Sequence, residues 1–88
     1  MSSSQSWALR IDPSVFKALK RIPRHERERI LGILQLFPVD PYFGDIQKMK
    51  GRADVWRRRV GSYRVFYRVF TEARMILVFH VERRTSNT

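Results

Sequence analysis

Arginine is the residue type in this sequence that is best placed to do chemistry, and it is concentrated in the second half of the chain. Residues 57–59 are consecutive arginines, and Arg64 and Arg68 follow closely. A guanidinium group is planar, stays charged, and can bind a phosphate bidentately or stack on a base. In a strand, Arg57 and Arg59 are expected about 6.6 Å apart, close to the spacing of neighbouring phosphates along an extended nucleic-acid strand. The spacing therefore predicts a site for two phosphates.

The net charge of the whole chain favours the same kind of partner. Eighteen Lys and Arg residues stand against eight Asp and Glu residues, which gives +10 on 88 residues. Each phosphate that a basic side chain neutralises releases condensed counterions and so favours binding. Nucleic acid is the first expectation and an anionic membrane surface the second. The alternative is that the excess charge serves only solubility.

The composition also excludes several classes of protein. The chain has no cysteine, so it can form neither a disulfide framework nor a thiolate zinc site. Its two histidines are far apart in sequence, and we expect chemistry that uses no metal and no cofactor. No apolar run approaches the roughly 20 residues of a membrane span, and residues 1–6 do not resemble a signal peptide. We expect a cytoplasmic protein whose partner is nucleic acid and not a membrane.

The first half of the sequence predicts a short strand and two helices. Residues 7–11 alternate apolar and polar side chains, as a strand does. Asp12 and Pro13 are typical of a helix start, and apolar residues recur at helical spacing until Pro23. A second helix is predicted from about Arg24 until just before Pro38.

The second half predicts strands, because the apolar period changes from 3.6 to 2 after the loop of residues 38–44. The expected strands span residues 45–50, 55–60, 63–70 and 75–84, with Gly61 and Ser62 as a two-residue turn. We predict an α+β fold with an N-terminal strand, a two-helix hairpin and an antiparallel sheet of three to four strands. Helices cover one face, and the other is open and basic. Residues 7–88 form a single domain after a disordered tail of residues 1–6.

The predicted turn decides which side chains share a face of the sheet. It pairs Val60 with Tyr63 and Arg59 with Arg64, and the pairing continues along both strands. The open face then carries Arg57, Arg59, Arg64, Phe66, Arg68 and Phe70. The core face carries Trp56, Val60, Tyr63, Val65, Tyr67 and Val69. Opposed arginines cost stability unless an anion relieves them. Arg58 is predicted to point toward the core, either at the sheet margin or because a bulge shifts the register.

Three stretches of this half together resemble the RelE/ParE superfamily of bacterial and archaeal toxins. They are Lys48-Met49-Lys50-Gly51, residues 56–67, and His80-Val81-Glu82-Arg83-Arg84. The most specific piece is the hairpin Gly61-Ser62-Tyr63-Arg64 with the aromatic residues that follow it. The predicted helical hairpin also fits, so the resemblance runs from about Trp7 to Thr88.

The RelE-like branch of this superfamily implies a toxin that cleaves messenger RNA in the ribosomal A site, inhibits translation and is held inactive by a cognate antitoxin. The implied reaction is a metal-free transesterification in which a ribose 2′-hydroxyl attacks the adjacent phosphorus. By position, Arg57 and Arg59 are similar to the family's pair of catalytic lysines, Arg64 to its hairpin arginine, and Arg84 to the arginine of its final strand. Further RNA contacts are expected from Lys48, Lys50, Arg52, Phe66, Arg68 and Arg83.

The sequence departs from the family pattern at two points. Arginine does not readily act as a general base, so Arg57 and Arg59 are expected to act electrostatically. Glu82 and His80 are then the candidates for the base, provided that their face of the last strand is the open one; a lone strand histidine is otherwise structural. The family's terminal aromatic is missing from residues 85–88. We therefore expect the chain to bind RNA better than it cuts it.

Two other functions fit the same residues. A ParE-like toxin of the same fold poisons DNA gyrase through protein contact, and the grouping of arginines favours RNA over this alternative. A non-catalytic RNA-binding module would use the same arginines and form no product.

Overall fold

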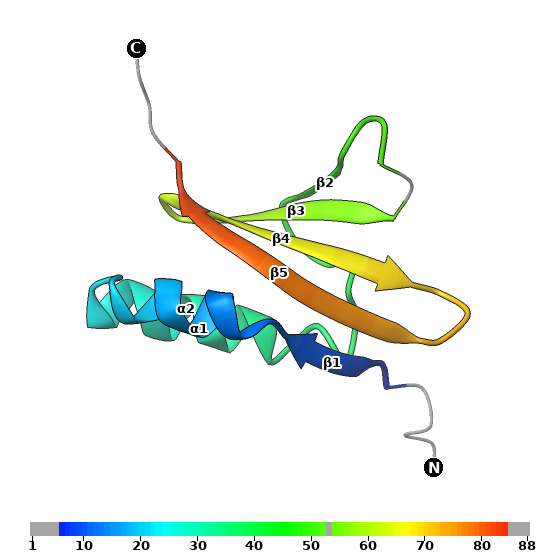
Figure 1. The fold of residues 1–88 in the computed structure, drawn as a ribbon, viewed down its shortest axis with the longest axis horizontal. Coiled ribbons are helices and arrows are strands. Elements are labelled where there is room, and N and C mark those ends of the chain that lie inside the picture. Colours follow the sequence, from blue (N-terminus) through cyan, green and yellow to red (C-terminus); the bar gives the residue numbers. More distant parts are fainter. Residues whose placement is uncertain (1–5, 53, 85–88) are drawn as a thin grey trace.

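The computed structural model describes residues 6–52 and 54–84. Its elements in chain order (Figure 1) are β1 (Ala8–Ile11), α1 (Pro13–Lys20), α2 (Arg24–Leu34), β2 (Ile46–Lys48), β3 (Val55–Val60), β4 (Tyr63–Phe70) and β5 (Met75–Arg83). The predicted order of strand, helical hairpin and strands is confirmed. Except for Ser6, the predicted tail lies outside the described residues, as do residues 85–88. No helix in the two described ranges is long and apolar enough to cross a bilayer.

The helices begin where the sequence indicates. Asp12 precedes α1 and accepts a hydrogen bond from the Ser14 amide at 3.0 Å. Hydrogen bonds from the Ser14 hydroxyl and amide lower the pKa of Asp12. The second helix ends at Leu34, earlier than predicted. The next residues form tighter turns, with the Phe37 amide donating to the Leu34 carbonyl at 3.2 Å.

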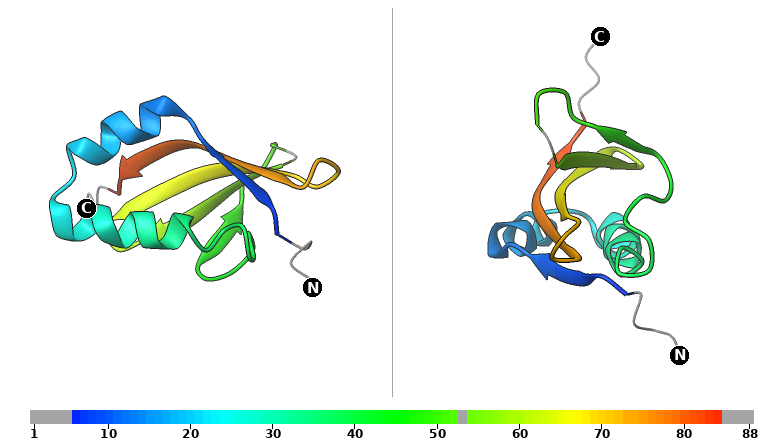
Figure 2. Two further views of the ribbon diagram at one scale, coloured as in Figure 1. Left: turned by 90° about the horizontal axis from the view of Figure 1, so that it is seen from below. Right: turned by 90° about the vertical axis from the view of Figure 1, so that its right-hand side faces the viewer.

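The strands form one five-stranded sheet in the order β1-β5-β4-β3-β2. The first strand runs parallel to β5, and the other neighbouring strands are antiparallel. The sheet is therefore larger than the predicted three to four strands, and it is mixed. Alternating side chains indicated β1 but could not indicate that its partner lies near the other end of the chain. Both helices cover the same face of the sheet, as Figures 1 and 2 show.

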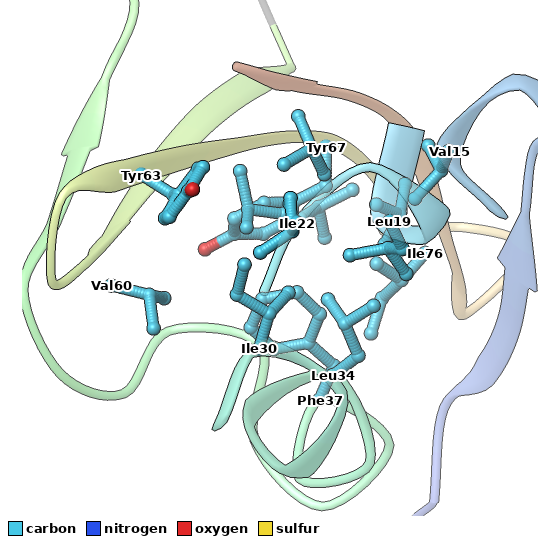
Figure 3. Close-up of a cluster of buried hydrophobic side chains, with 14 residues drawn as sticks. Val15, Leu19, Ile22, Ile30, Leu34, Phe37, Val60, Tyr63, Tyr67 and Ile76 are labelled. Atoms are coloured by element: carbon cyan, nitrogen blue, oxygen red, sulfur yellow. The ribbon is translucent and has the colours of Figure 1, made fainter. Parts of the chain in front are cut away.

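The core lies between that face and the helices (Figure 3). Near its centre the rings of Phe37 and Tyr67 are 4.5 Å apart, and the Tyr67 hydroxyl donates to the Pro41 carbonyl at 2.7 Å. Burial raises the pKa of Tyr67, so its hydroxyl stays a proton donor. The predicted core face is confirmed, except that Trp56 is only partly buried.

The hairpin register and the position of Arg58 are also resolved. The pairs Val60–Tyr63, Arg59–Arg64 and Arg57–Phe66 are those predicted. Arg58 points to the helix side without any bulge in β3: its guanidinium lies 4.4 Å from the centre of the Phe43 ring and donates to the Phe43 carbonyl at 3.0 Å. It therefore covers the margin of the core, with its charge satisfied by a carbonyl and an aromatic face.

A β-bulge in β5 decides which side chains face outward at the end of the sheet. Phe66 pairs with His80, whereas the next residue, Tyr67, pairs with Val78. Phe79 is the extra residue. Because of this shift, Val78 and Val81 are both buried, and Phe79 and His80 both line a hollow on the open face.

One glycine is favoured by its left-handed backbone conformation, and we predict a substitution that tests this. Gly44 has φ +82°, and a Cβ atom there would overlap the Arg58 guanidinium. Gly44→Ala is expected to lower the free energy of unfolding by about 1–3 kcal/mol. Gly32, inside α2, has no atom within 4 Å of the place where an added Cβ would lie. Gly32→Ala is therefore expected to raise the free energy of unfolding by about 0.5–1 kcal/mol. Urea denaturation of both variants measures the two free energies of unfolding, which should change in opposite directions. A stabilising Gly44→Ala would contradict the strain expected at this φ.

Candidate functional site

Four arginines surround a hollow of about 140 Å³ on the open face, which we call the arginine hollow. It is lined by Asp45, Gln47, Arg57, Arg59, Arg64 and Arg84. Arg59 and Arg64 are directly paired across β3 and β4. The Arg84 amide donates to the Ser62 carbonyl at 2.6 Å, which ties the chain after β5 to the β3–β4 turn. The structure thus brings together the four arginines that the sequence suggested for catalysis, although their roles stay predictions.

Few acidic side chains lie at the arginine hollow, and their contacts with the arginines are weak. The Arg59–Asp45 ion pair is long, at 3.9 Å, and Arg57 donates to the side-chain oxygen of Gln47. Glu82 lies beside the hollow, with its Oε2 atom 3.4 Å from Nη1 of Arg64. Solvent-exposed ion pairs contribute about 0–1 kcal/mol. An incoming phosphate can therefore replace these contacts at little cost in free energy. Its oxygens can then accept hydrogen bonds from guanidinium groups on several sides.

Glu82 and His80 lie on the open face, which answers a question that the sequence left undecided. Nε2 of His80 is 3.1 Å from Oε1 of Glu82, and the other oxygen of that carboxylate contacts Arg64. The carboxylate is thus held between an imidazole and a guanidinium at the edge of the arginine hollow. Such an arrangement places a proton acceptor next to the positive charges that would bind a phosphate.

A second hollow of about 350 Å³, which we call the aromatic hollow, lies next to this site. It is lined by Met49, Lys50, Arg52, Val55, Phe66, Phe79 and His80. The two hollows are neighbours because Arg57, which lines the first, is directly paired with Phe66, which lines the second. Of the predicted RNA contacts, Lys50, Arg52 and Phe66 are gathered here. Sequence reasoning missed Phe79, since the sequence left undecided which face of the last strand is the open one.

Two of the predicted RNA contacts lie on the helix side of the sheet, and a third lies on the open face with its charge engaged by neighbouring side chains. Lys48 is paired with Trp56, and directly paired residues share a face of the sheet. Because Trp56 is on the helix face, Lys48 is separated from the arginine hollow by the sheet. Arg83 is paired with Tyr63 and lines a hollow beside α1. Both therefore lie on the side of the sheet away from the arginine hollow, and their contact with RNA stays a prediction. Arg68 does lie on the open face, but its guanidinium contacts Asp54 at 3.1 Å and the Phe70 ring at 4.7 Å.

Sequence reasoning also missed Asp45 and Gln47, which lie on or just before β2 and line the arginine hollow. Gln47 is paired with Arg57, so it shares the open face, and alternation along β2 is the signal that could have found it. Within residues 6–52 and 54–84, no group of three or more His, Asp or Glu side chains is arranged to hold a metal ion.

Comparison with known proteins identifies the family. The sequence model of the ParE toxins of type II toxin-antitoxin systems, parDE, matches residues 9–87. The chain belongs to this family. The predicted membership of the RelE/ParE superfamily is therefore confirmed. The family match spans both helices, both hollows and all of the sheet except Ala8, so the open arginine face belongs to a ParE-family toxin.

Relatives of this ParE-family chain include RelE1 of Methanocaldococcus jannaschii, which is 31% identical over 77 residues that cover 84% of this chain and 86% of RelE1. Among solved structures, the archaeal RelE-RelB complex from Pyrococcus horikoshii contains a chain that is 26% identical, with a TM-score of 0.81 and coverage of 93% and 99% of the two chains. The RelB-RelE antitoxin-toxin complex from Methanococcus jannaschii contains one that is 29% identical, with a TM-score of 0.73 and coverage of 85% and 90%.

Proposed function

We propose that this toxin is a ribosome-dependent endoribonuclease that inhibits translation by cleaving messenger RNA in the A site. The observation that carries the proposal is the arginine hollow, in which four guanidinium groups converge on an open face. A site of this kind suits the phosphodiester of a single RNA strand, because RNA in an extended conformation exposes both its phosphates and its bases. Such an enzyme acts in the cytoplasm, where ribosomes are found.

In the proposed reaction, the ribose 2′-oxygen forms a bond to phosphorus while the bond from phosphorus to the 5′-oxygen breaks. The products are a 2′,3′-cyclic phosphate and a free 5′-hydroxyl. Arg57 and Arg59 hold the phosphate, and Arg64 stabilises the additional negative charge of the phosphorane-like transition state. Glu82 accepts the proton of the 2′-hydroxyl, and His80 orients Glu82 through its Nε2 atom. The departing 5′-oxygen takes its proton from water.

We further propose that a cognate antitoxin holds the toxin inactive. Two of the similar structures are complexes of RelE with RelB, which supports a partner of this kind. The surplus of positive charge on the open face favours an antitoxin segment that carries carboxylates and competes with RNA.

The test is incubation of the purified toxin with programmed ribosomes and a labelled mRNA. We expect cleavage in the A-site codon, products with 5′-hydroxyl ends, and no change on addition of EDTA at concentrations that leave ribosomes intact. The second candidate, inhibition of DNA gyrase, is favoured by the match to the ParE family model. Absence of mRNA cleavage together with trapped gyrase–DNA complexes would select it. RNA binding without any product would select the non-catalytic module.

A further inference from the structure

We propose that the aromatic hollow is a nucleobase site, which holds a base of the same RNA strand whose phosphate lies in the arginine hollow. This proposal rests on the proposed function. It adds the path that the bound RNA strand would take over the sheet. The base would lie against Phe66 and Phe79, and the backbone would pass from there toward Arg57 and Arg59. The ligand class is any single-stranded RNA, since stacking does not depend on base identity.

The spacing of the two hollows follows from the strand register. Arg59 is paired with Arg64, and two residues along β3 Arg57 is paired with Phe66. Consecutive side chains on one face of a strand are about 6.6 Å apart. This distance is comparable with that between a phosphate and the base of its own nucleotide. One nucleotide can therefore place its phosphate among the arginines and its base beside Phe66.

The side chains of the aromatic hollow are arranged to accept a flat group. The centre of the Phe66 ring is 6.5 Å from that of Phe79 and 5.5 Å from that of His80, and both pairs of planes are inclined at 47°. The rings therefore diverge and do not stack fully on one another, which leaves ring surface for a base. A volume of about 350 Å³ falls within the range of about 300–1,000 Å³ that is typical of small-ligand sites.

The surroundings of the aromatic hollow favour RNA over an apolar side chain of a partner protein. Lys50 and Arg52 form part of its wall, on the β2–β3 connection, which rises from the sheet on the side away from the helices (Figures 1 and 2). These charges complement the phosphates that flank a bound base. An apolar side chain of a partner protein that filled the same space would gain nothing from these charges.

The bulge is a second indication that this face is shaped for a ligand. It removes regular pairing at Phe79 and turns Phe79 and His80 to the same side. Bulges are frequent where a strand must re-aim a side chain next to a functional site. Here the re-aimed ring is that of His80, which the shift brings beside Phe66 and Phe79 in the aromatic hollow.

The proposal is tested with two RNA probes, a single-stranded octanucleotide and the same octanucleotide with one abasic position, whose dissociation constants are compared. Probes with the abasic position at each site in turn locate the base that is bound. We expect the wild type to prefer the intact RNA at one position by about 5- to 150-fold, the usual value of one stacked base. Phe79→Ala and Phe79→Leu should both abolish this preference, and Phe79→Tyr should retain it.

Phe79→Leu keeps apolar volume and loses the aromatic face, so it isolates stacking from packing. Phe16→Ala is the matched control, because Phe16 lies on α1 with 46% of its surface exposed, on the side of the sheet opposite to the hollow. Thermal unfolding confirms that each variant is folded. An unchanged preference in folded Phe79→Leu, or no measurable RNA binding by the wild type, would overturn the base site.

These outcomes are separate from those of the ribosome assay. If mRNA is cleaved and the preference does not depend on Phe79, the base site fails while the proposed function stands. If the preference depends on Phe79 and no mRNA is cleaved, the base site stands and the endoribonuclease fails.

Discussion

Replacing Arg64 with alanine is expected to slow cleavage of ribosome-bound mRNA by about 10³–10⁵-fold, the usual effect of an arginine that stabilises a phosphoryl-transfer transition state. Arg64 is chosen because it connects the parts of the site. It lines the arginine hollow, is paired with Arg59 and contacts Glu82 at 3.4 Å. Its side chain is 32% exposed, compared with 47% for Arg59. A less exposed charge is screened less by water.

Two variants control for the loss of a positive charge. Arg24→Ala removes the same charge from a side chain that is 80% exposed on α2, and it should leave the cleavage rate unchanged. Arg64→Lys keeps the charge and loses the bidentate fork, so its rate should lie between those of the wild type and Arg64→Ala. Arg84→Ala should also be slow. A folded Arg64→Ala that cleaves at the wild-type rate would remove Arg64 from the mechanism.

The hairpin that carries most of the arginine hollow was predictable because its turn is local. Two residues join β3 to β4, and Gly61 has φ +60°, as such a turn requires. Once Val60 faces Tyr63, every later pair follows, and a slip of one residue would turn the buried valines to solvent. The turn and the alternation of side chains are therefore enough to place Arg57, Arg59 and Arg64 on one face.

The last strand was not predictable in the same way, because it contains the bulge. Strict alternation from Ile76 and Val78, both buried, would continue with His80 and Glu82 pointing into the core. Burial of a carboxylate without a partner is costly. The extra residue avoids this cost by burying Val81 in place of His80 and turning Glu82 outward. No local turn signal marks this position, so the faces of His80 and Glu82 depend on tertiary packing.

The position of Glu82 leads to the second large expected effect. Glu82→Gln should lower the rate of mRNA cleavage by about 10²–10⁴-fold, the usual contribution of a general base. Glutamine has nearly the same shape and can still accept a hydrogen bond from Arg64, but it cannot take the 2′-hydroxyl proton. RNA binding should not weaken, since the substitution removes a negative charge beside the phosphate site. Single-turnover cleavage and dissociation constants measured on the same preparations separate the two quantities.

The competing explanation is that Glu82 only neutralises Arg64, and it predicts a different outcome. If the carboxylate merely occupies the arginine hollow until RNA arrives, its removal should tighten binding and leave the cleavage step as fast as before, or faster. A base, in contrast, acts in the cleavage step itself, so Glu82→Gln should slow single-turnover cleavage even when RNA is saturating. Glu72→Gln, in the exposed β4–β5 loop, removes an equal charge away from the site and should change neither property. A fast Glu82→Gln with tighter RNA binding would therefore assign the proton transfer to another group, with His80 the next to replace.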